Sequence, residues 1–286
     1  MTINVVKRDG RKEPLDIDKI HKVLEWACTG ITAVSVSEIE LRSHIQFYDK
    51  IKSSDIQETL IKATADLITE EAPNYQYVAG RLINYHLRKE VYGKYEPEPL
   101  NYHYQVVMNQ GYYDVELRHA YSVEEWIELD KYIDHNRDNL LTYAAMEQLR
   151  SKYLVKNRAT GKIFETPQIA FMLIAMTLFS KYTENRIQWV KDLYDSLSNF
   201  DISLPTPIMA GVRTPQRQFS SCVLIEADDS LDSINATTSA IVKYVSQKAG
   251  IGIGAGRIRA LGSAIRNGDA SHTGVIPFYK HFQSAV

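Results

Sequence analysis

Two prolines in the segment Glu96-Pro97-Glu98-Pro99 divide this chain of 286 residues. Each proline lacks a backbone N–H donor and disfavours helical backbone at the residue before it, so we expect no helix to cross the segment. The segment therefore predicts a boundary between one domain over residues 1–95 and new structure from residue 96 onward. A length of 286 residues suits roughly two domains, and a hydrophobic content of 44% is ordinary for globular proteins.

Composition narrows the class of protein further. The net charge of −2 gives no global footprint for nucleic acid. Two cysteines exclude a disulfide scaffold and favour a reducing, cytoplasmic compartment. The start at Met1 lacks a basic-then-apolar leader, and the longest apolar run, 169–179, is shorter than the ~20 residues that a membrane span needs. We expect a soluble cytoplasmic protein that binds neither nucleic acid nor membrane and holds no metal.

The first 95 residues predict four helices beside a small hairpin. Residues 5–12 form a strand that breaks at Asp9-Gly10, and residues 13–15 continue the hairpin. Apolar residues then recur at helical spacing, with Asp16 or Asp18 capping the first helix and Ser54 with Gln57 forming a capping box for the third. The expected helices cover residues 17–30, 37–48, 54–67 and 74–93.

Beyond the prolines the pattern stays helical to residue 200 and then alternates. Ser122 and Glu125 predict a capping box, residues 140–153 a helix, and residues 154–164 a hairpin. Further helices are expected over 166–180 and 184–198. Strands near residues 202 and 223 alternate with a long helix over 231–248, which suggests a parallel sheet or barrel over 201–286. The expected fold class is α/β, mostly helical.

One cysteine stands at the start of an apolar strand. Cys222 follows Ser220-Ser221 and precedes Val223-Leu224-Ile225, which we interpret as a short buried strand. The serines supply hydrogen-bond donors near the sulfur, as a redox thiol requires. A small buried hydrophobic role for Cys222 remains open, because free cysteine is among the most buried residue types. Cys28 lies in the apolar series of the first helix, where packing explains it.

Glycines recur at every second position after the long helix. Gly250, Gly252, Gly254 and Gly256 leave one face of a strand without side chains, so a ligand or another backbone can approach closely. This spacing is not the dinucleotide fingerprint G-x-G-x-x-G, which opens a helix. Close structural packing is an equal alternative for the glycines other than Gly250.

Three charged segments are candidates for binding phosphate or ribose. Lys7, Arg8, Arg11, Lys12 and Lys19 crowd the first hairpin and helix start, Asp229-Ser230-Leu231 opens a helix, and Arg257, Arg259 and Arg266 surround a glycine-rich loop. Cations and free helix amides bind anions well. The alternatives are a solvated charged face, ordinary helix capping and a solvated basic loop, respectively.

Five motifs in order carry a family resemblance: LPTPIMAGVRTP, RQFSSCVLIE, DSL, GIGIGAGRIRA and HTGVIPFYKHFQ. Residues 203–286, which contain them, resemble the large (α) subunit of class I ribonucleotide reductase. Residues 5–95 resemble the ATP-cone regulatory domain that precedes this catalytic subunit. The resemblance implies a four-helix cone with a small sheet over 1–95, a helical region over 96–200, and over 201–286 the first strands of a ten-stranded α/β barrel.

The resemblance also implies an activity site for ATP or dATP, bound with Mg, and a switch in subunit association. The cone residues that match the family's effector contacts are Lys7, Glu13, Pro14, Leu15, Asp16, Ile17, Asp18, Lys19, Ser53 and Lys89. His86 and Gln57 rank lower as ligand positions. A second, specificity site for a dNTP is implied at Asp229, Ser230, Leu231, Arg259 and Arg266. Because the family builds that site across a dimer, homodimerisation is expected there.

The implied chemistry replaces the ribose 2′-hydroxyl of a ribonucleoside diphosphate with hydrogen. Thr206, Ser221, Cys222 and Gly250 match substrate-pocket positions. Cys222 matches one of two thiols that supply electrons and end as a disulfide, which thioredoxin or glutaredoxin reduces. The resemblance further implies that no cofactor is bound covalently and that a separate di-iron-type small subunit supplies the radical.

The family continues for several hundred residues past Val286. The second reducing thiol and the radical cysteine lie there, so we expect this chain to be inactive alone and to need a C-terminal chain that completes the barrel. A split large subunit and a truncated piece are both open. The alternative functions are a stand-alone ATP/dATP-sensing module without catalysis, and a decoy without nucleotide affinity.

Overall fold

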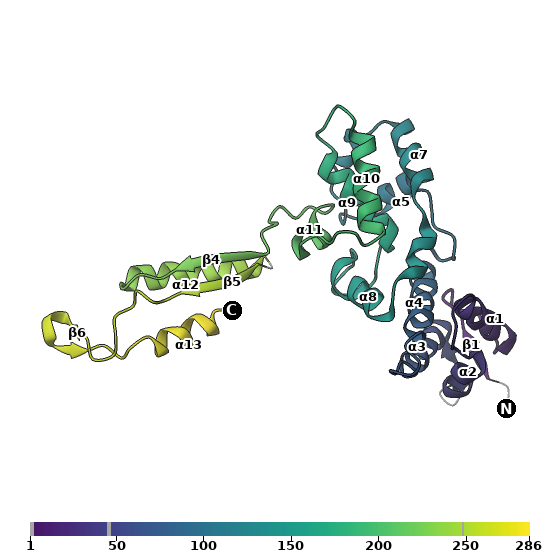
Figure 1. Ribbon diagram of the computed structural model, residues 1–286, viewed down its shortest axis with the longest axis horizontal. Coiled ribbons are helices and arrows are strands. Elements are labelled where there is room, and N and C mark those ends of the chain that lie inside the picture. The colour runs from purple at the N-terminus through teal and green to yellow at the C-terminus, as the bar shows by residue number, and fades with distance from the viewer. Residues whose placement is uncertain (1–2, 45–46, 248) are drawn as a thin grey trace. The chain divides into compact units, whose positions relative to one another are not determined.

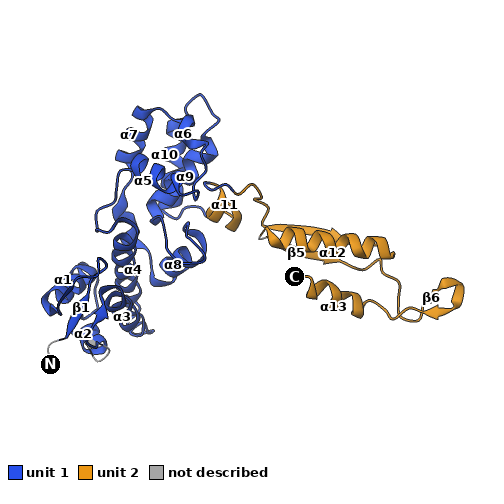
Figure 2. Cartoon of the chain, turned by 180° about the vertical axis from the view of Figure 1, so that it is seen from behind, with its two compact units in different colours: residues 1–203, 213–215 blue, residues 204–212, 216–286 orange. Residues whose placement is uncertain are grey.

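The computed structural model describes residues 3–44, 47–247 and 249–286. The chain forms two compact units (Figures 1 and 2). Unit 1 holds residues 1–203 and 213–215, and unit 2 holds residues 204–212 and 216–286. The predicted boundary at residue 96 falls inside unit 1, so the cone and the helical region pack as one body, and the three-domain division stays a prediction.

A three-stranded sheet and four helices form the first part of unit 1. The central strand β1 pairs antiparallel with β2 and parallel with β3. The predicted hairpin is present, with Gly10 at a φ of +85° in its turn, and Asp16 caps the first helix through the Lys19 amide. The elements are β1 (Asn4–Val6), β2 (Lys12–Pro14), α1 (Ile17–Cys28), α2 (Val36–His44), β3 (Ile51–Lys52), α3 (Ser53–Ala65) and α4 (Tyr75–Tyr92).

The rest of unit 1 is helical and is built around α9, whose residues from Pro167 to Met176 are buried. Thr166 and Pro167 start that helix as predicted. The Ser122–Glu125 capping box is also present. The elements are α5 (Leu100–Asn109), α6 (Leu117–Ala120), α7 (Val123–Tyr132), η1 (His135–Leu140), α8 (Tyr143–Gln148), η2 (Leu149–Tyr153), α9 (Pro167–Phe179) and α10 (Arg186–Ser198).

Unit 2 contains a pair of parallel strands with a helix packed on one face (Figure 1). Ile234 and Ile241 of the long helix and Phe282 of the last helix form its buried core, against which Ile225 and Ile253 pack. The elements are α11 (Thr206–Gly211), β4 (Cys222–Glu226), α12 (Leu231–Ser246), β5 (Gly250–Gly254), β6 (Ala264–Ile265), η3 (Arg266–Gly268), β7 (Ala270–Ser271) and α13 (Ile276–Ser284).

Several local predictions are wrong. Ser54 and Gln57 form no capping box, because α3 begins one residue earlier and its N-cap, Lys52, ends a strand paired with β1. The helix expected over 140–153 is divided into a 3₁₀ turn, α8 and the π-helix η2. No strand lies near residue 202, where an extended segment leads into α11 instead. The hairpin over 154–164 has its turn but only one bridge, Lys156 to Ile163.

Two predicted helices run into residues outside the described part of the chain. The helix expected over 37–48 is α2, which is described to His44, while residues 45 and 46 lie outside the description. The helix expected over 231–248 is α12, which ends at Ser246, and Lys248 lies outside. None of the helices in the described ranges is at once long and apolar enough to cross a bilayer.

Candidate functional site

A cavity of about 740 Å³ lies between the N-terminal sheet and helices α1, α3 and α4. Six cationic side chains and three carboxylates line it. Apolar residues, including Val5, Ile20, Val23 and Ile56, form another part of the wall. Ligand pockets for small molecules span ~300–1,000 Å³ and combine apolar walls with a few polar groups. The cavity therefore suits an anionic ligand that also has an apolar or aromatic part.

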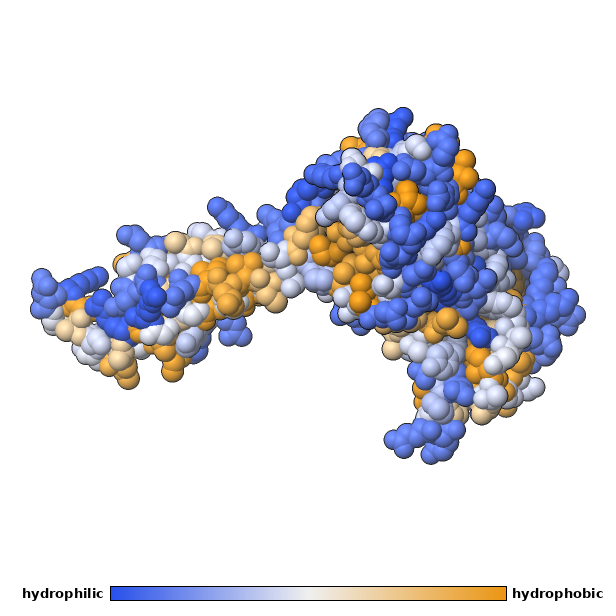
Figure 3. Space-filling view, turned by 45° about the horizontal axis from the view of Figure 1, so that its top comes forward, coloured by the Kyte–Doolittle hydropathy of each residue, from blue (hydrophilic) through white to orange (hydrophobic). Residues whose placement is uncertain are grey.

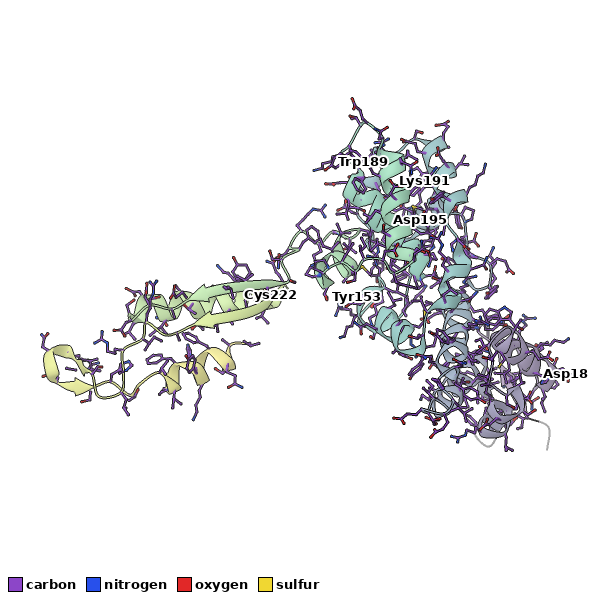
Figure 4. The ribbon with its side chains drawn as sticks, in the orientation of Figure 1. Asp18, Tyr153, Trp189, Lys191, Asp195 and Cys222 are labelled. Carbon is purple, nitrogen blue, oxygen red and sulfur yellow. The ribbon has the colours of Figure 1, made fainter. Side chains whose placement is uncertain are left out.

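Most of the predicted activity-site residues meet in this cavity. Lys7, Glu13, Pro14, Leu15, Asp16, Lys19, Ser53 and Lys89 line it. Ile17 and Asp18 lie instead on the neighbouring surface of the same loop, and Asp18 is exposed on α1 (Figure 4). Residues separated by more than 80 positions are thus brought together by the packing of α4 against α1 and α3.

Two of the cavity's lysines, Lys7 and Lys19, are paired with carboxylates of the same lining. Lys7 Nζ lies 3.0 Å from Glu13 Oε1, and Lys19 Nζ lies 3.7 Å from that oxygen and 3.4 Å from Asp16 Oδ2. The hydrogen bond from Lys7 lowers the pKa of the Glu13 carboxyl. A phosphate group that entered would exchange these partners for its own oxygens, so the lysines are already oriented for an anion.

Helix α4 contributes an aromatic wall that the sequence pattern did not assign to a site. Lys89 Nζ lies 4.1 Å from the Tyr85 ring centroid and donates a hydrogen bond to its hydroxyl. Tyr85 in turn packs against Trp26 and Tyr95, at centroid distances of 5.8 and 5.6 Å. The signal was the i, i+4 spacing of Tyr85 and Lys89, which places both on one helical face.

His86 lies beside the cavity and not in its lining. Arg8, which lines the cavity, approaches His86 Nδ1 at 3.3 Å through Nη2. On the other side, His86 Nε2 lies 3.4 Å from Glu58 Oε1. Burial lowers the pKa of His86 to about 4, so the ring is neutral at pH 7. Of the two positions ranked lower as ligands, Gln57 lines the cavity and His86 does not, and both rankings stay predictions.

In unit 2, three of the four predicted substrate residues lie together. Cys222 and Gly250 are partners across the parallel strands, and the Gly250 amide donates to the Ser221 carbonyl at 2.8 Å. A Cβ on Gly250 would lie 3.6 Å from Cys222 Sγ and 3.3 Å from the Ser221 oxygen. Thr206 is the first residue of α11, in a different element. Cys222 is a free, exposed thiol at the start of β4 (Figure 4).

The strand that carries Cys222 is not fully buried, and this corrects the sequence interpretation. Ile225 packs against the core and Val223 is half-buried, but Leu224 is 87% exposed. Leu224 lies opposite Gly252, and a Cβ there would come within 2.6 Å of Leu224 Cδ2. Figure 3 shows apolar side chains gathered on the surface of unit 2. One face of the strand pair is therefore open: Cys222, Leu224 and Glu226 of β4 lie on it beside the glycines of β5, with the sulfur at one end.

The third candidate site is formed by residues that follow β5 and residues that precede α12. Arg259 donates to both oxygens of Asp229, through its amide at 3.1 Å and Nε at 2.6 Å. Ser230 caps α12 through the Ser233 amide, and Leu231 is exposed. Asp229 and Arg259 are thus brought together, while Arg266 lies on the β6–β7 hairpin with a φ of +53°. Arg257 pairs with Glu226 and Asp228, each at 3.0 Å.

Comparison with known families gives three matches in chain order. The ATP cone domain matches residues 3–90, the all-alpha domain of ribonucleotide reductase residues 139–217, and its barrel domain residues 220–286. The chain belongs to the ribonucleotide reductase large-subunit family. It corresponds to the N-terminal portion of an α subunit: the cone, the all-alpha domain and the start of the barrel.

Individual relatives can be aligned with this chain over nearly its whole length. Ribonucleoside-diphosphate reductase 1 subunit alpha of Escherichia coli (strain K12) is 62% identical over 283 residues, which are 99% of this chain and 37% of that protein. The α subunit of Haemophilus influenzae is 60% identical over 100% of this chain and 38% of that protein. The α subunit of Enterobacteria phage T4 is 51% identical over 99% and 38%. The chain spans less than two fifths of the length of these curated relatives.

Proposed function

We propose that this chain provides the effector sites and one wall of the substrate site of a ribonucleoside-diphosphate reductase. The cone cavity binds ATP or dATP, with the triphosphate and its Mg on the lysine side and the base against the apolar and aromatic wall. The observation that carries this proposal is the convergence of Lys7, Lys19, Ser53 and Lys89 on one cavity in the domain that matches the ATP cone.

The proposed reaction reduces the substrate's 2′-carbon. The C–O bond to the 2′-hydroxyl breaks, oxygen leaves as water, a C–H bond forms, and two thiols become one disulfide. Cys222 is one of those thiols, and its exposure on the open face of the strand pair gives substrate access to the sulfur. Thr206, Ser221 and the Gly250 backbone hold the diphosphate, because a glycine there leaves room beside the sulfur.

The proposal requires further components. The remaining part of the large subunit, in the same or another polypeptide, supplies the second thiol and the other strands. A small di-iron-type subunit supplies the radical, and thioredoxin or glutaredoxin reduces the disulfide in the cytoplasm. We place the dNTP specificity site at Asp229–Leu231, Arg259 and Arg266, in a homodimer formed through that region. The Asp229–Arg259 pair supports this assignment, since it joins the two predicted segments.

The decisive experiment uses this chain together with the remaining large-subunit sequence and the small subunit. With CDP, ATP and a thioredoxin system we expect dCDP formation, and Cys222→Ala should lower turnover by at least ~1,000-fold because the disulfide cannot form. Cys28→Ala is the matched control and should keep full turnover. Wild-type turnover in the Cys222→Ala enzyme would contradict the proposed role of this sulfur.

A further inference from the structure

The guanidinium of Arg150 is held by two carboxylates within unit 1. Nη1 and Nη2 donate to the two oxygens of Glu58 at 2.8 and 3.4 Å. Nε and Nη2 donate to the two oxygens of Glu147 at 2.9 and 2.6 Å. Arg150 lies in the π-helix η2, and π-helical segments are rare and occur frequently at functional sites. A forked contact fixes the direction of a carboxylate as well as its distance.

Glu58 connects this pair to a buried histidine on α4. Glu58 Oε1, which accepts from Arg150, also lies 3.4 Å from His86 Nε2. The side chain of His86 is 9% exposed, and α4 packs against both α3 and α8 (Figure 1). The orientation of the imidazole ring therefore depends on where the Glu58 carboxylate is held.

The other side of the same ring faces the cone cavity. Arg8 lines the cavity, and its Nη2 lies 3.3 Å from His86 Nδ1. Arginine can only donate, so Nδ1 accepts, and a neutral His86 carries its proton on Nε2, facing Glu58. Each link in this series of contacts thus places a donor opposite an acceptor, from the cavity wall to η2.

We infer that Arg150 is a positioning residue for nucleotide binding, which acts through Glu58 and His86. It fixes the carboxylate that holds the ring, and the ring holds Arg8 at the cavity wall. This inference rests on the proposed binding of ATP or dATP in the cavity. Arg150 lies outside the segment that matches the ATP cone and within the segment that matches the all-alpha domain. The affinity of the cone is thus set in part by a residue of the neighbouring helical region.

Stability alone does not explain the double fork on Arg150. The three side chains of this cluster, those of Arg150, Glu58 and Glu147, are partly exposed. Ion pairs in contact with solvent add little to the free energy of unfolding. What two forks add is a fixed orientation of the Glu58 carboxylate, which is the group that faces His86.

Two variants separate orientation from charge. Arg150→Met removes both forks, whereas Arg150→Lys keeps the positive charge but loses the planar, bidentate geometry. The matched control is Arg186→Met. Arg186 is forked on Glu125 in the same unit, does not line the cavity, and has a side chain that is 20% exposed against 21% for Arg150.

The first measurement is isothermal titration of the full chain with ATP and with dATP. Both Arg150 variants should bind each nucleotide at least ~5-fold more weakly than wild type, because each loses the forks. Arg186→Met should stay within about twofold of wild type. Should Arg150→Met fail to fold, Arg150→Lys carries the same test.

A double-mutant cycle tests the route from Arg150 to the cavity. Arg8→Met should lower affinity at least ~10-fold, because a charge-assisted contact to phosphate is lost. Arg8→Met combined with Arg150→Met should bind within about twofold of Arg8→Met alone. Two residues of which one acts through the other are not additive.

The second measurement needs no nucleotide. Burial lowers the pKa of His86 to about 4. The charges that face the ring are Glu58 and Asp55, which raise this pKa, and Arg8 and Arg150, which lower it. At pH 5 such a pKa leaves about one tenth of the rings protonated. Arg150→Met removes one cation and frees Glu58, so this fraction should rise at least ~2-fold. Nitrogen-15 NMR of the histidines measures it, with His86→Gln to assign the signal and Arg186→Met as the unchanged control.

The outcomes separate this inference from the proposed function. Wild-type affinity in Arg150→Met or Arg8→Met overturns the inference, and so does full additivity in the cycle. Wild-type affinity in Arg150→Lys also overturns it, because charge and not orientation would then be sufficient. If the wild-type chain binds neither ATP nor dATP, the proposed function fails and the His86 titration decides the link: an unchanged protonated fraction overturns it, and a raised fraction supports it.

Discussion

The cone cavity and the open face of β4–β5 differ in how much of each site this chain supplies. The cavity is walled by one sheet and three helices, and two of its lysines, Lys7 and Lys19, are paired with carboxylates of its own lining. The strand face has a single layer, with Leu224 exposed and glycines along the opposite strand. The comparison teaches that the proposed effector site is enclosed by residues of one compact unit, whereas the proposed substrate site has only one open wall in this chain.

The largest expected difference between the two regions is in thiol reactivity. Burial raises the pKa of Cys28 on α1 to about 11, so only about one thousandth of this thiol is ionised at pH 8. Cys222 is exposed. We expect iodoacetamide at pH 8 to label Cys222 at least ~100-fold faster than Cys28, because the thiolate is the nucleophile.

Peptide mass mapping over time measures both labelling rates in one sample. The variant Cys222→Ser serves as a control, since its remaining label must lie on Cys28. Equal rates at the two positions would show that the β4–β5 face is covered in this chain, and the contrast drawn above would be wrong.

A second prediction concerns the cavity. Lys89→Met keeps the side-chain length but removes the ammonium that lies over the Tyr85 ring. A charge-assisted contact to phosphate contributes ~1.5–3 kcal/mol, so affinity for ATP and dATP should fall about 10- to 100-fold. Isothermal titration of this chain with each nucleotide tests this, without any other component.

The control for Lys89 is Lys94→Met. Lys94 pairs with Glu98 at 2.8 Å on the surface and does not line the cavity. Its removal should leave both affinities within about twofold. A Lys89 variant that binds as tightly as wild type would place the phosphates elsewhere.

The smallest predicted effect concerns the stability of unit 1 in acid, which depends on its buried His103. Burial lowers the pKa of His103 to about 4, below its ordinary value of 6.5. A histidine with a depressed folded-state pKa stabilises the fold above pH 6.5, and this contribution is lost as pH falls towards 4. At pH 5 the loss from this group is ~2 kcal/mol, and His103→Phe, which keeps the ring beside Tyr92 and Tyr113, should remove it.

Urea unfolding at pH 7 and pH 5 measures this difference. The comparison is made between variant and wild type because Asp138, whose pKa burial raises to about 6, changes stability in the opposite direction over the same range. His21→Gln is the control: the hydrogen bond to Glu40 raises the pKa of His21, so its removal cannot reduce the acid loss. An equal loss in wild type and His103→Phe would contradict a neutral buried His103.

Local sequence signals predicted those parts of the fold that depend on neighbours along the chain. The Asp16 cap, the Ser122–Glu125 box and the Thr166-Pro167 helix start each need only residues within one turn. The Ser54–Gln57 box failed because Ile51–Lys52 pairs with a strand more than forty residues earlier, which sets where α3 begins. Such a pairing leaves no mark on the local pattern.

The candidate sites could likewise be predicted only where the signal is local in the sequence. Lys7, Lys19 and Lys89 could be identified, but Lys22 and Tyr85 could not. The helical spacing of Tyr85 equally fits a core position. Three consecutive apolar residues suggested a buried strand, yet Leu224 faces outward. Periodicity does not reveal which face of a strand its own chain covers. The assignment of individual ligand contacts at all three sites stays a prediction.

Helix α4 has a consequence for attempts to transplant the cone. Its residue Gly80 meets the Leu141 carbonyl so closely that a Cβ would lie 2.1 Å from that oxygen, and Arg81 donates to the carbonyls of Asn139, Ala27 and Thr29. The same helix presents Tyr85 and Lys89 to the cavity. A cone excised at residue 95 would therefore expose the face of α4 that packs against α8 and η1. A chimaera built from this cone needs a host surface that covers the same face.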